Sequence, residues 1–120
     1  ERGTFLANQL ALQLKPILSA KLEKMSIKVS EIDSFPQISN PKTAIIIVDD
    51  VVNSGFTAMK IATQIFEQGV KSIETAFLAE RKHRNFPIQA NYVGLSISTT
   101  LKDHVFFDNS NPDNLIIYLA

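Results

Sequence analysis

The residues with the clearest chemistry are two adjacent aspartates, Asp49 and Asp50, which stand between an apolar run and a loop of small residues. The stretch reads AIIIVDDVVNSGFTAMKIA, from Ala44 to Ala62. Carboxylates accept hydrogen bonds from hydroxyl groups and bind metal ions. The first turn of a helix offers unpaired N–H groups and the positive end of the helix dipole to a phosphate. Because carboxylates repel a phosphate, the pattern predicts a ligand with hydroxyls or a metal beside its phosphate, as in a sugar phosphate.

The loop between the acids and the helix would form the phosphate site. Gly55 lets the backbone approach a ligand closely, and the hydroxyls of Ser54 and Thr57 can donate hydrogen bonds. The alternative is purely structural: Ser54 caps a helix that follows an acidic strand end.

Three predicted elements hold this loop in place. Residues Ile45 to Val48 are β-branched with no polar alternation, which is typical of a parallel strand buried on both faces. From Phe56 to Gln68 the apolar residues follow helical spacing, and Gly69 supplies a helix stop. Ser72 to Ala79 form another strand. This order predicts an α/β domain with a mainly parallel sheet, in which ligands bind beyond the carboxyl ends of the strands.

The remaining segments complete the domain. Leucines four residues apart predict a helix from Phe5 to about Glu23, kinked at Pro16. Alternating residues predict a strand over 26–32, turn residues predict a loop over 33–43, and residues 80–87 form a basic turn. Short strands are expected near residues 91–97, 104–107 and 115–119.

Composition argues against several classes of function. The chain has 120 residues, 45% of them hydrophobic, which is enough for one domain with a single core. Twelve basic and twelve acidic residues cancel, so no overall field favours nucleic acid or membrane. The absence of cysteine removes disulfide and thiolate chemistry and fits a reducing cytoplasm. No apolar run approaches the roughly 20 residues of a membrane span. His83 and His104 are too far apart to suggest a metal site.

The segment IIIVDDVVNSGFT, residues 45–57, resembles the motif with which type I phosphoribosyltransferases bind phosphoribosyl pyrophosphate (PRPP). The shared features are an apolar strand, two acids, two apolar residues and a small-residue loop that opens a helix. The resemblance implies the type I phosphoribosyltransferase fold, with short strands at the C-terminal end. It implies that Asp49 and Asp50 hold the ribose hydroxyls during catalysis and that Mg²⁺ is the cofactor. The implied 5′-phosphate site consists of Asn53, Ser54, Gly55, Phe56 and Thr57.

Three further segments are similar to PyrR proteins, which regulate pyrimidine operons and often also have uracil phosphoribosyltransferase activity. The segments are RGTFLANQLA at 2–11, SEID at 30–33 and RKHRNFPIQANYVGLSIST at 81–99. The resemblance also implies a homo-oligomer, with a dimer as the default. The implied roles are pyrophosphate binding for Arg2 and Gly3, a nucleobase pocket at Leu101 and Lys102, and a position near the metal for Asp108.

Several positions depart from the family patterns. Purine phosphoribosyltransferases carry an aspartate base where this chain has Asn53, which cannot accept a proton at neutral pH, so the sequence favours uracil over a purine. Phe56 and Gln89 stand where PyrR proteins carry arginines. The candidate RNA-contacting residues that remain are Lys82, His83 and Arg84. Because each lost cation weakens contacts to phosphates, RNA is a doubtful partner, and the alternative for this turn is a solvated loop.

Two expectations concern the segments around the motif. Residues 1–3 correspond to a loop that follows a central strand in this fold, so we expect a few tens of residues before Glu1. Residues 33–43 take the place of the flexible lid over PRPP, but they are few and contain no Arg or Lys before Lys42. Either the lid is truncated or the natural protein has more of it.

Two functions therefore stay open. The first is an enzyme that transfers the phosphoribosyl group of PRPP to a nucleobase, uracil being favoured, with Mg²⁺. The second is a regulator with the same fold that binds a nucleotide or PRPP as a signal, with or without RNA, and does not turn it over. The acidic pair and the phosphate loop support ligand binding in both cases.

Overall fold

The computed structural model describes residues 2–16, 25, 27, 37–38, 43–97, 105–108, 110–111 and 116–119. Helix α1 spans Arg2–Leu14 and helix α2 spans Phe56–Glu67. The strands are β1 (Ala44–Val52), β2 (Ser72–Arg81), β3 (Tyr92–Ile97), β4 (Val105–Asp108) and β5 (Ile116–Leu119).

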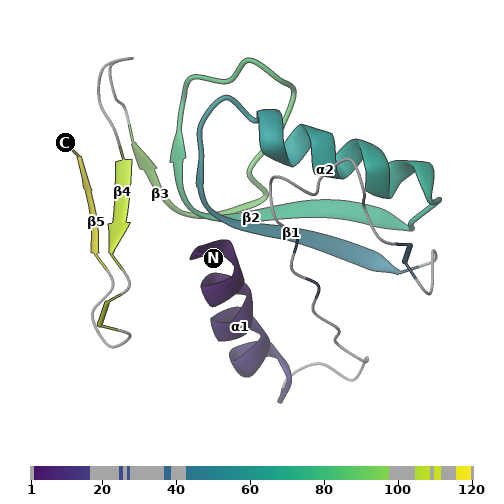
Figure 1. Ribbon diagram of the computed structural model, residues 1–120, viewed down its shortest axis with the longest axis horizontal. Helices are drawn as coiled ribbons and strands as arrows, with labels where there is room; N and C mark the ends of the chain where they lie inside the picture. Colours follow the sequence, from purple (N-terminus) through teal and green to yellow (C-terminus); the bar gives the residue numbers. More distant parts are fainter. Residues whose placement is uncertain are drawn as a thin grey trace.

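The first three strands form one parallel sheet in the order β1-β2-β3. Val48 pairs with Ala76 between β1 and β2, and Phe77 pairs with Val93 between β2 and β3. In Figure 1 helix α2 lies above β1 and β2 and helix α1 lies below them. Strands β4 and β5 form a separate antiparallel pair. The predicted α/β class, the mainly parallel sheet with flanking helices and the short C-terminal strands are confirmed.

The helix boundaries follow from proline and glycine. Helix α2 begins at Phe56 and ends at Glu67, one residue before the predicted end, and Gly69 follows with φ of 79°. Helix α1 begins at Arg2 and ends at Leu14, two residues before Pro16, and the predicted kink stays a prediction because the chain directly after Pro16 lies outside the described residues. Proline disfavours the helical conformation of the residue before it, which explains the earlier end. Residues 17–24 and nearly all of the predicted strand over 26–32 lie outside the described residues.

The core of the described residues is small, and its buried residues come from α1, α2, β1 and β2. The buried apolar residues are Ala11, Ile47, Val52, Ala58, Ile65, Ala76, Phe77 and Ala79. Two-sided burial was predicted for residues 45–48, but Ile46 is 47% exposed. The physical reason is position: β1 is an edge strand of the three-stranded sheet, and β2 in the middle is the more continuously buried.

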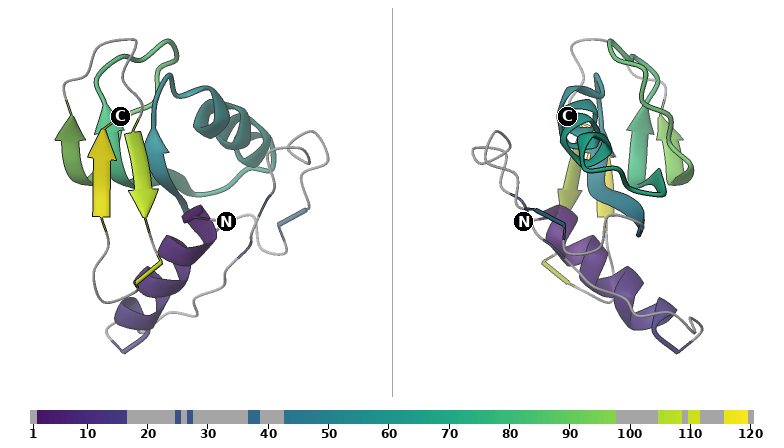
Figure 2. Two further views of the ribbon diagram at one scale, coloured as in Figure 1. Left: turned by 60° about the vertical axis from the view of Figure 1, so that its left-hand side comes forward. Right: turned by 90° about the vertical axis from the view of Figure 1, so that its right-hand side faces the viewer.

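The connection from β2 to β3, residues 82–91, contains no helix, although parallel strands are usually joined by one. Its residues Ile88 and Ala90 pack against the buried cluster of Val52, Ala58 and Phe77. The connection thus covers apolar surface at the carboxyl end of β1. In both views of Figure 2, α1 begins beside the sheet and runs away from it, so its first turn is the part nearest β1.

The far end of the connection is anchored to β2 through Thr75, a buried polar residue that is 5% exposed. The Thr75 hydroxyl donates to the carbonyl oxygen of Gln89. The backbone N–H of Thr75 donates to Oδ1 of Asn91 at 2.9 Å, and the N–H of Asn91 donates to the Thr75 hydroxyl at 3.1 Å. These bonds hold the chain along β2 just before β3 begins.

Candidate functional site

The first turn of α1 lies directly against the carboxyl half of β1. A Cβ atom at Gly3 would lie 3.1 Å from Oδ1 of Asp49 and 3.2 Å from the carbonyl oxygen of Val48. Both distances are shorter than ordinary contacts to a Cβ. Glycine at this position therefore lets the helix backbone approach the Asp49 carboxyl group, and it places both predicted ends of a PRPP site, Gly3 and Asp49, side by side.

Asp49 is a half-buried acid with an altered titration. Its Oδ1 accepts the N–H of Asp50 at 2.8 Å. Burial is the largest of the causes that raise the pKa of Asp49 to about 6, and the side chain of Asp50 adds to it. The carboxyl group is therefore mostly ionised at neutral pH, but it takes up a proton in mild acid. Such a shift is common in binding and catalytic sites, where function outweighs stability.

The turn after β1 depends on a left-handed glycine. Gly55 has φ of 87°, and a Cβ there would lie 3.2 Å from the Cβ of Ile88. Gly55, and not Ser54, is the N-cap residue of α2, and it offers no side-chain cap. The Ser54 hydroxyl accepts the N–H of Phe56 only at 3.3 Å, which is long for a hydrogen bond. The alternative that Ser54 caps the helix is therefore wrong, and the first turn of α2 keeps amides for a ligand.

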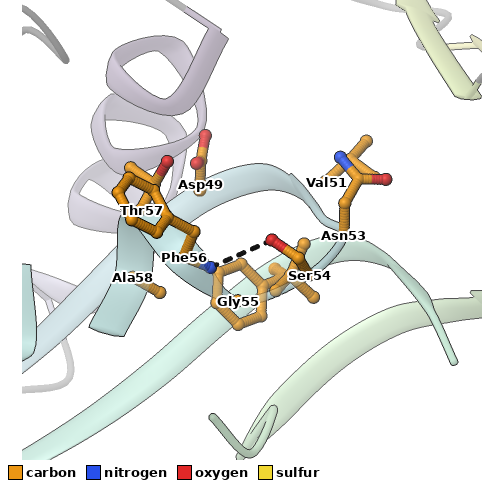
Figure 3. A pocket seen from close by; sticks show the side chains of 10 residues that line it. Asp49, Val51, Asn53, Ser54, Gly55, Phe56, Thr57 and Ala58 are labelled. Atoms are coloured by element: carbon orange, nitrogen blue, oxygen red, sulfur yellow. Dashed lines mark hydrogen bonds between the residues drawn. The ribbon is translucent and has the colours of Figure 1, made fainter. Parts of the chain in front are cut away.

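One cleft gathers most of these residues (Figure 3). The residues that line it are Asp49, Val51, Val52, Asn53, Ser54, Gly55, Phe56, Thr57, Ala58 and Phe77. All five residues predicted to bind the 5′-phosphate are included, together with the first acid of the pair. The sequence analysis did not single out Val51, Val52, Ala58 and Phe77. The two valines stand inside the recognised motif, whereas Phe77 reaches the cleft only because β2 pairs beside β1.

Asp50 is not among the residues that line the cleft. Successive side chains of a strand point to opposite faces, which separates it from Asp49. Its Oδ1 accepts the N–H of Val51 at 2.7 Å. The ribose-binding role of Asp50 stays a prediction.

The other predicted site residues either do not line the cleft or lie outside the described residues. Arg2 and Gly3 belong to α1 and not to a loop. Leu101 and Lys102 lie outside the described residues. Asp108 ends β4 and does not line the cleft, and hydrogen bonds from the side chain and from the N–H of Ser110, the latter at 2.9 Å, lower its pKa. Its predicted place near a metal remains a prediction.

The basic turn exposes Lys82 and His83, whereas Arg84 faces inward. Its Nη1 donates to the carbonyl oxygens of Asn53, at 3.0 Å, and of Arg81. Its Nε donates to Ile88 O at 3.3 Å, and Glu80 lies 3.7 Å from Nη2. The guanidinium of Arg84 is therefore bound to the neighbouring loops, and the RNA contact expected of Lys82, His83 and Arg84 stays a prediction.

Phe56 joins the turn to the same connection. Its ring meets that of Phe86 edge to face, with centroids 5.7 Å apart, and Nζ of Lys60 lies 5.9 Å from its centroid. Phe56 is still 52% exposed, so it presents an apolar surface at the cleft.

The described part of the chain contains no group of three or more histidine, cysteine, aspartate or glutamate residues suited to a metal ion. None of its helices has the length and apolarity required to span a bilayer.

A half-buried acid and a glycine turn at the carboxyl edge of a parallel sheet define a class of α/β proteins that bind phosphorylated small molecules. Comparison with known families narrows this class. Residues 1–110 match the phosphoribosyl transferase domain, and the chain belongs to this family.

The curated relatives are proteins called bifunctional protein PyrR. The chain is 36% identical to that of Caldicellulosiruptor saccharolyticus over 103 residues, which is 83% of this chain and 54% of the relative. It is 28% identical to that of Streptococcus pneumoniae over 128 residues, covering 94% of this chain and 71% of the relative. The chain thus spans about half the length of the first of these relatives. The resemblance to PyrR is confirmed.

Among solved structures, a hypoxanthine phosphoribosyltransferase from Staphylococcus aureus is 28% identical with a TM-score of 0.45. The match covers 47% of this chain and 31% of that one.

Proposed function

We propose that this protein transfers the 5-phosphoribosyl group of PRPP to a nucleobase, with uracil as the favoured base and uridine monophosphate and pyrophosphate as the products. The observation that carries the proposal is the single cleft that joins Asp49 to the turn of Asn53–Thr57. A sugar phosphate needs both parts at once, because its phosphate seeks amides and its hydroxyls seek a carboxylate.

The turn and the first turn of α2 would hold the 5′-phosphate. Gly55 adopts a left-handed conformation and has no side chain, so it leaves the backbone accessible to a ligand at the cleft. The hydroxyls of Ser54 and Thr57 add hydrogen-bond donors. The positive end of the α2 dipole adds to the attraction for the dianion. Asp49 would accept hydrogen bonds from the ribose hydroxyls. Asp50, the next residue, would be a second acceptor for these hydroxyls when the ligand is bound.

Transfer builds positive charge on the sugar ring while pyrophosphate leaves. A fixed ribose lets the base nitrogen attack in line, which is a gain from orientation. The ionised Asp49 carboxylate beside the ring favours this charge. Gly3 and the amides around it, placed next to Asp49, together with Arg2 would face the leaving pyrophosphate.

The acidic residues fit the way in which proteins hold Mg²⁺ with a phosphorylated substrate. Mg²⁺ usually takes one or two carboxylates and completes its shell with substrate phosphates and water. Asp49 in the cleft supplies one such carboxylate, and the described residues show no closed cage of three ligands. When bound, Mg²⁺ would neutralise charge on the departing pyrophosphate.

Uracil is favoured because of Asn53. Its side-chain amide, whose Oδ1 accepts Arg81 Nη1 at 3.4 Å, cannot take a proton from a purine ring at neutral pH. The dimer expected from the resemblance stays a prediction.

The test measures uridine monophosphate formed from uracil and PRPP with Mg²⁺, with hypoxanthine as the competing base. We expect turnover with uracil, and a loss of at least about a hundredfold in Asp49→Asn and in Asp49→Ala, since an oriented charge is removed. Glu67→Gln is the matched control, because Glu67 is an exposed acid at the far end of α2 and does not line the cleft. Turnover that survives in Asp49→Asn, or that prefers hypoxanthine, contradicts the proposal.

One observation favours the second candidate, a regulator that binds PRPP without turnover. The predicted lid segment is described only at Gln37 and Ile38, and the N–H of Ile38 donates to Gln68 Oε1 at 2.6 Å. Gln68 follows the last residue of α2, roughly 18 Å from the cleft at the other end of this helix. Ile38 is therefore held away from the cleft, which a lid over PRPP would have to cover during turnover. Retained PRPP binding without product would support this candidate over the enzyme.

A further inference from the structure

We propose that Arg84 is a positioning residue for phosphate binding: it fixes the peptide groups of the turn after β1 so that their N–H groups point into the cleft. This inference rests on the proposed function, since it concerns the same phosphate site. It assigns to Arg84 a role inside the protein in place of a contact with an external anion.

Two carbonyl oxygens of the turn accept hydrogen bonds from the connection. The carbonyl oxygen of Asn53 accepts Arg84 Nη1 at 3.0 Å. The carbonyl oxygen of Ser54 accepts two backbone N–H groups of the connection, from Asn85 at 2.9 Å and from Phe86 at 3.1 Å. Two consecutive carbonyls of the turn therefore face the connection of residues 82–91.

Because the peptide bond is planar, the direction of these carbonyl groups also fixes the direction of the N–H groups that follow them. In a trans peptide, the C=O of one residue and the N–H of the next point in opposite directions. With both carbonyls directed at the connection, the N–H groups of Ser54 and Gly55 are directed away from it. Within the described residues, neither of these N–H groups has a hydrogen-bond partner.

The cleft lies on the side to which these amides point. Its lining includes Ser54 and Gly55 but no residue of the connection. Successive backbone amides that converge in this way form a concavity suited to anions.

Arg84 is suited to this task by the shape of its guanidinium group. One fork binds carbonyl oxygens from three places, Asn53 in the turn and Arg81 and Ile88 in the connection. Lysine carries the same charge but is a single point donor without the planar fork. The Glu80 carboxylate, 3.7 Å from Nη2, balances the charge of Arg84 and reduces its direct pull on a ligand. The structure thus predicts an effect of geometry and not of charge.

The experiment separates the two effects with three variants of the full chain. Arg84→Met removes the fork and the charge, Arg84→Lys removes the fork and keeps the charge, and Lys82→Met removes an exposed charge from the same connection. The probe is ribose 5-phosphate, with its dissociation constant measured by calorimetry. We expect both Arg84 variants to weaken binding about tenfold or more and Lys82→Met to weaken it less than about twofold.

A second measurement does not require a ligand. Amide hydrogen exchange of Asn85 and Phe86 reports their bonds to Ser54 O, and exchange should rise in both Arg84 variants but not in Lys82→Met. Melting temperatures of all three variants show that each is folded. Parent-like binding in Arg84→Lys, an equal loss in Lys82→Met, or unchanged exchange in the Arg84 variants would each overturn the inference. If the parent binds neither ribose 5-phosphate nor PRPP, the proposed function fails, and the exchange data alone decide whether Arg84 fixes the turn.

Discussion

The turn after β1 and the connection after β2 meet at the same edge of the sheet, but they differ in which of their backbone groups are hydrogen-bonded. The connection is tied inward at both ends, by Arg84 near its start and by the bonds between Thr75 and Asn91 near its finish. In the turn, the carbonyl oxygens accept hydrogen bonds from the connection, and the N–H groups of Ser54 and Gly55 stay unpaired at the cleft within the described residues. A ligand site made of backbone needs unpaired donors, and a neighbouring loop supplies the rigidity that those donors lack.

The contact between the two regions is tested most strongly at Gly55. Gly55→Ala must place a Cβ 3.2 Å from Ile88 in a left-handed conformation. We expect the free energy of unfolding to fall by about 2–5 kcal/mol, roughly 1–2 from the backbone and the rest from the clash. Chemical denaturation measures this loss.

Gly69 offers the matched control for this change. It has a similar φ of 79°, but a Cβ there would meet nothing within 4 Å. Gly69→Ala should therefore show only the backbone cost, about 1–2 kcal/mol. Equal losses in the two variants would mean that the turn does not press against the connection.

The burial of Asp49 at the cleft is tested through the pH dependence of stability. Its pKa of about 6 in the folded protein, against 3.8 for an ordinary aspartate, means that the folded state binds a proton more tightly than the unfolded state. Stability therefore falls as pH rises from about 4 to 6 and is level above that window. The difference is about two pKa units, worth about 3 kcal/mol at most.

Asp49→Asn mimics the neutral acid, so it should raise the free energy of unfolding at pH 7.5 by about 1–3 kcal/mol and give almost no gain at pH 3.5. Asp108→Asn is the control with the opposite sign, because the pKa of Asp108 is lowered by its bond to Ser110. That variant should lose stability at pH 7.5. Denaturation of both variants across pH 3.5–7.5 decides, and a destabilised Asp49→Asn at neutral pH would refute the buried-acid account.

The local features of the turn were accessible from the sequence because they depend on neighbours along the chain. The run of Ile45–Val48, the small residues 53–55 and Gly69 predict β1, the turn and the end of α2 to within a few residues. The paired acids pointed to Asp49 for the same reason. The role of Asp50 could not be judged, because at a strand end the side that a residue faces depends on the packing of the whole sheet.

The features that sequence reasoning missed all depend on contacts between distant segments. Arg84 was interpreted as a surface cation because nothing in the sequence shows that Asn53 lies beside it, 31 positions earlier. The exposure of Ile46 is another case, since an edge strand and a central strand can have the same β-branched composition. Phe77 at the cleft likewise follows from strand pairing alone.

The last test asks whether the connection is rigid enough to support the turn, and it targets Thr75. Thr75→Val removes a buried hydroxyl and leaves the carbonyl of Gln89 and the N–H of Asn91 without that partner. Losing a buried hydrogen bond in this way costs about 1–3 kcal/mol. Thr63→Val is the control: its exposed hydroxyl donates only to Met59 O within α2, at 2.8 Å, so its loss should be about 0.5 kcal/mol or less. If the anchor matters to the site, Thr75→Val also weakens ribose 5-phosphate binding while Thr63→Val does not. A stability loss at Thr75 with unchanged binding would show that the connection supports the turn through Arg84 and Ile88 alone.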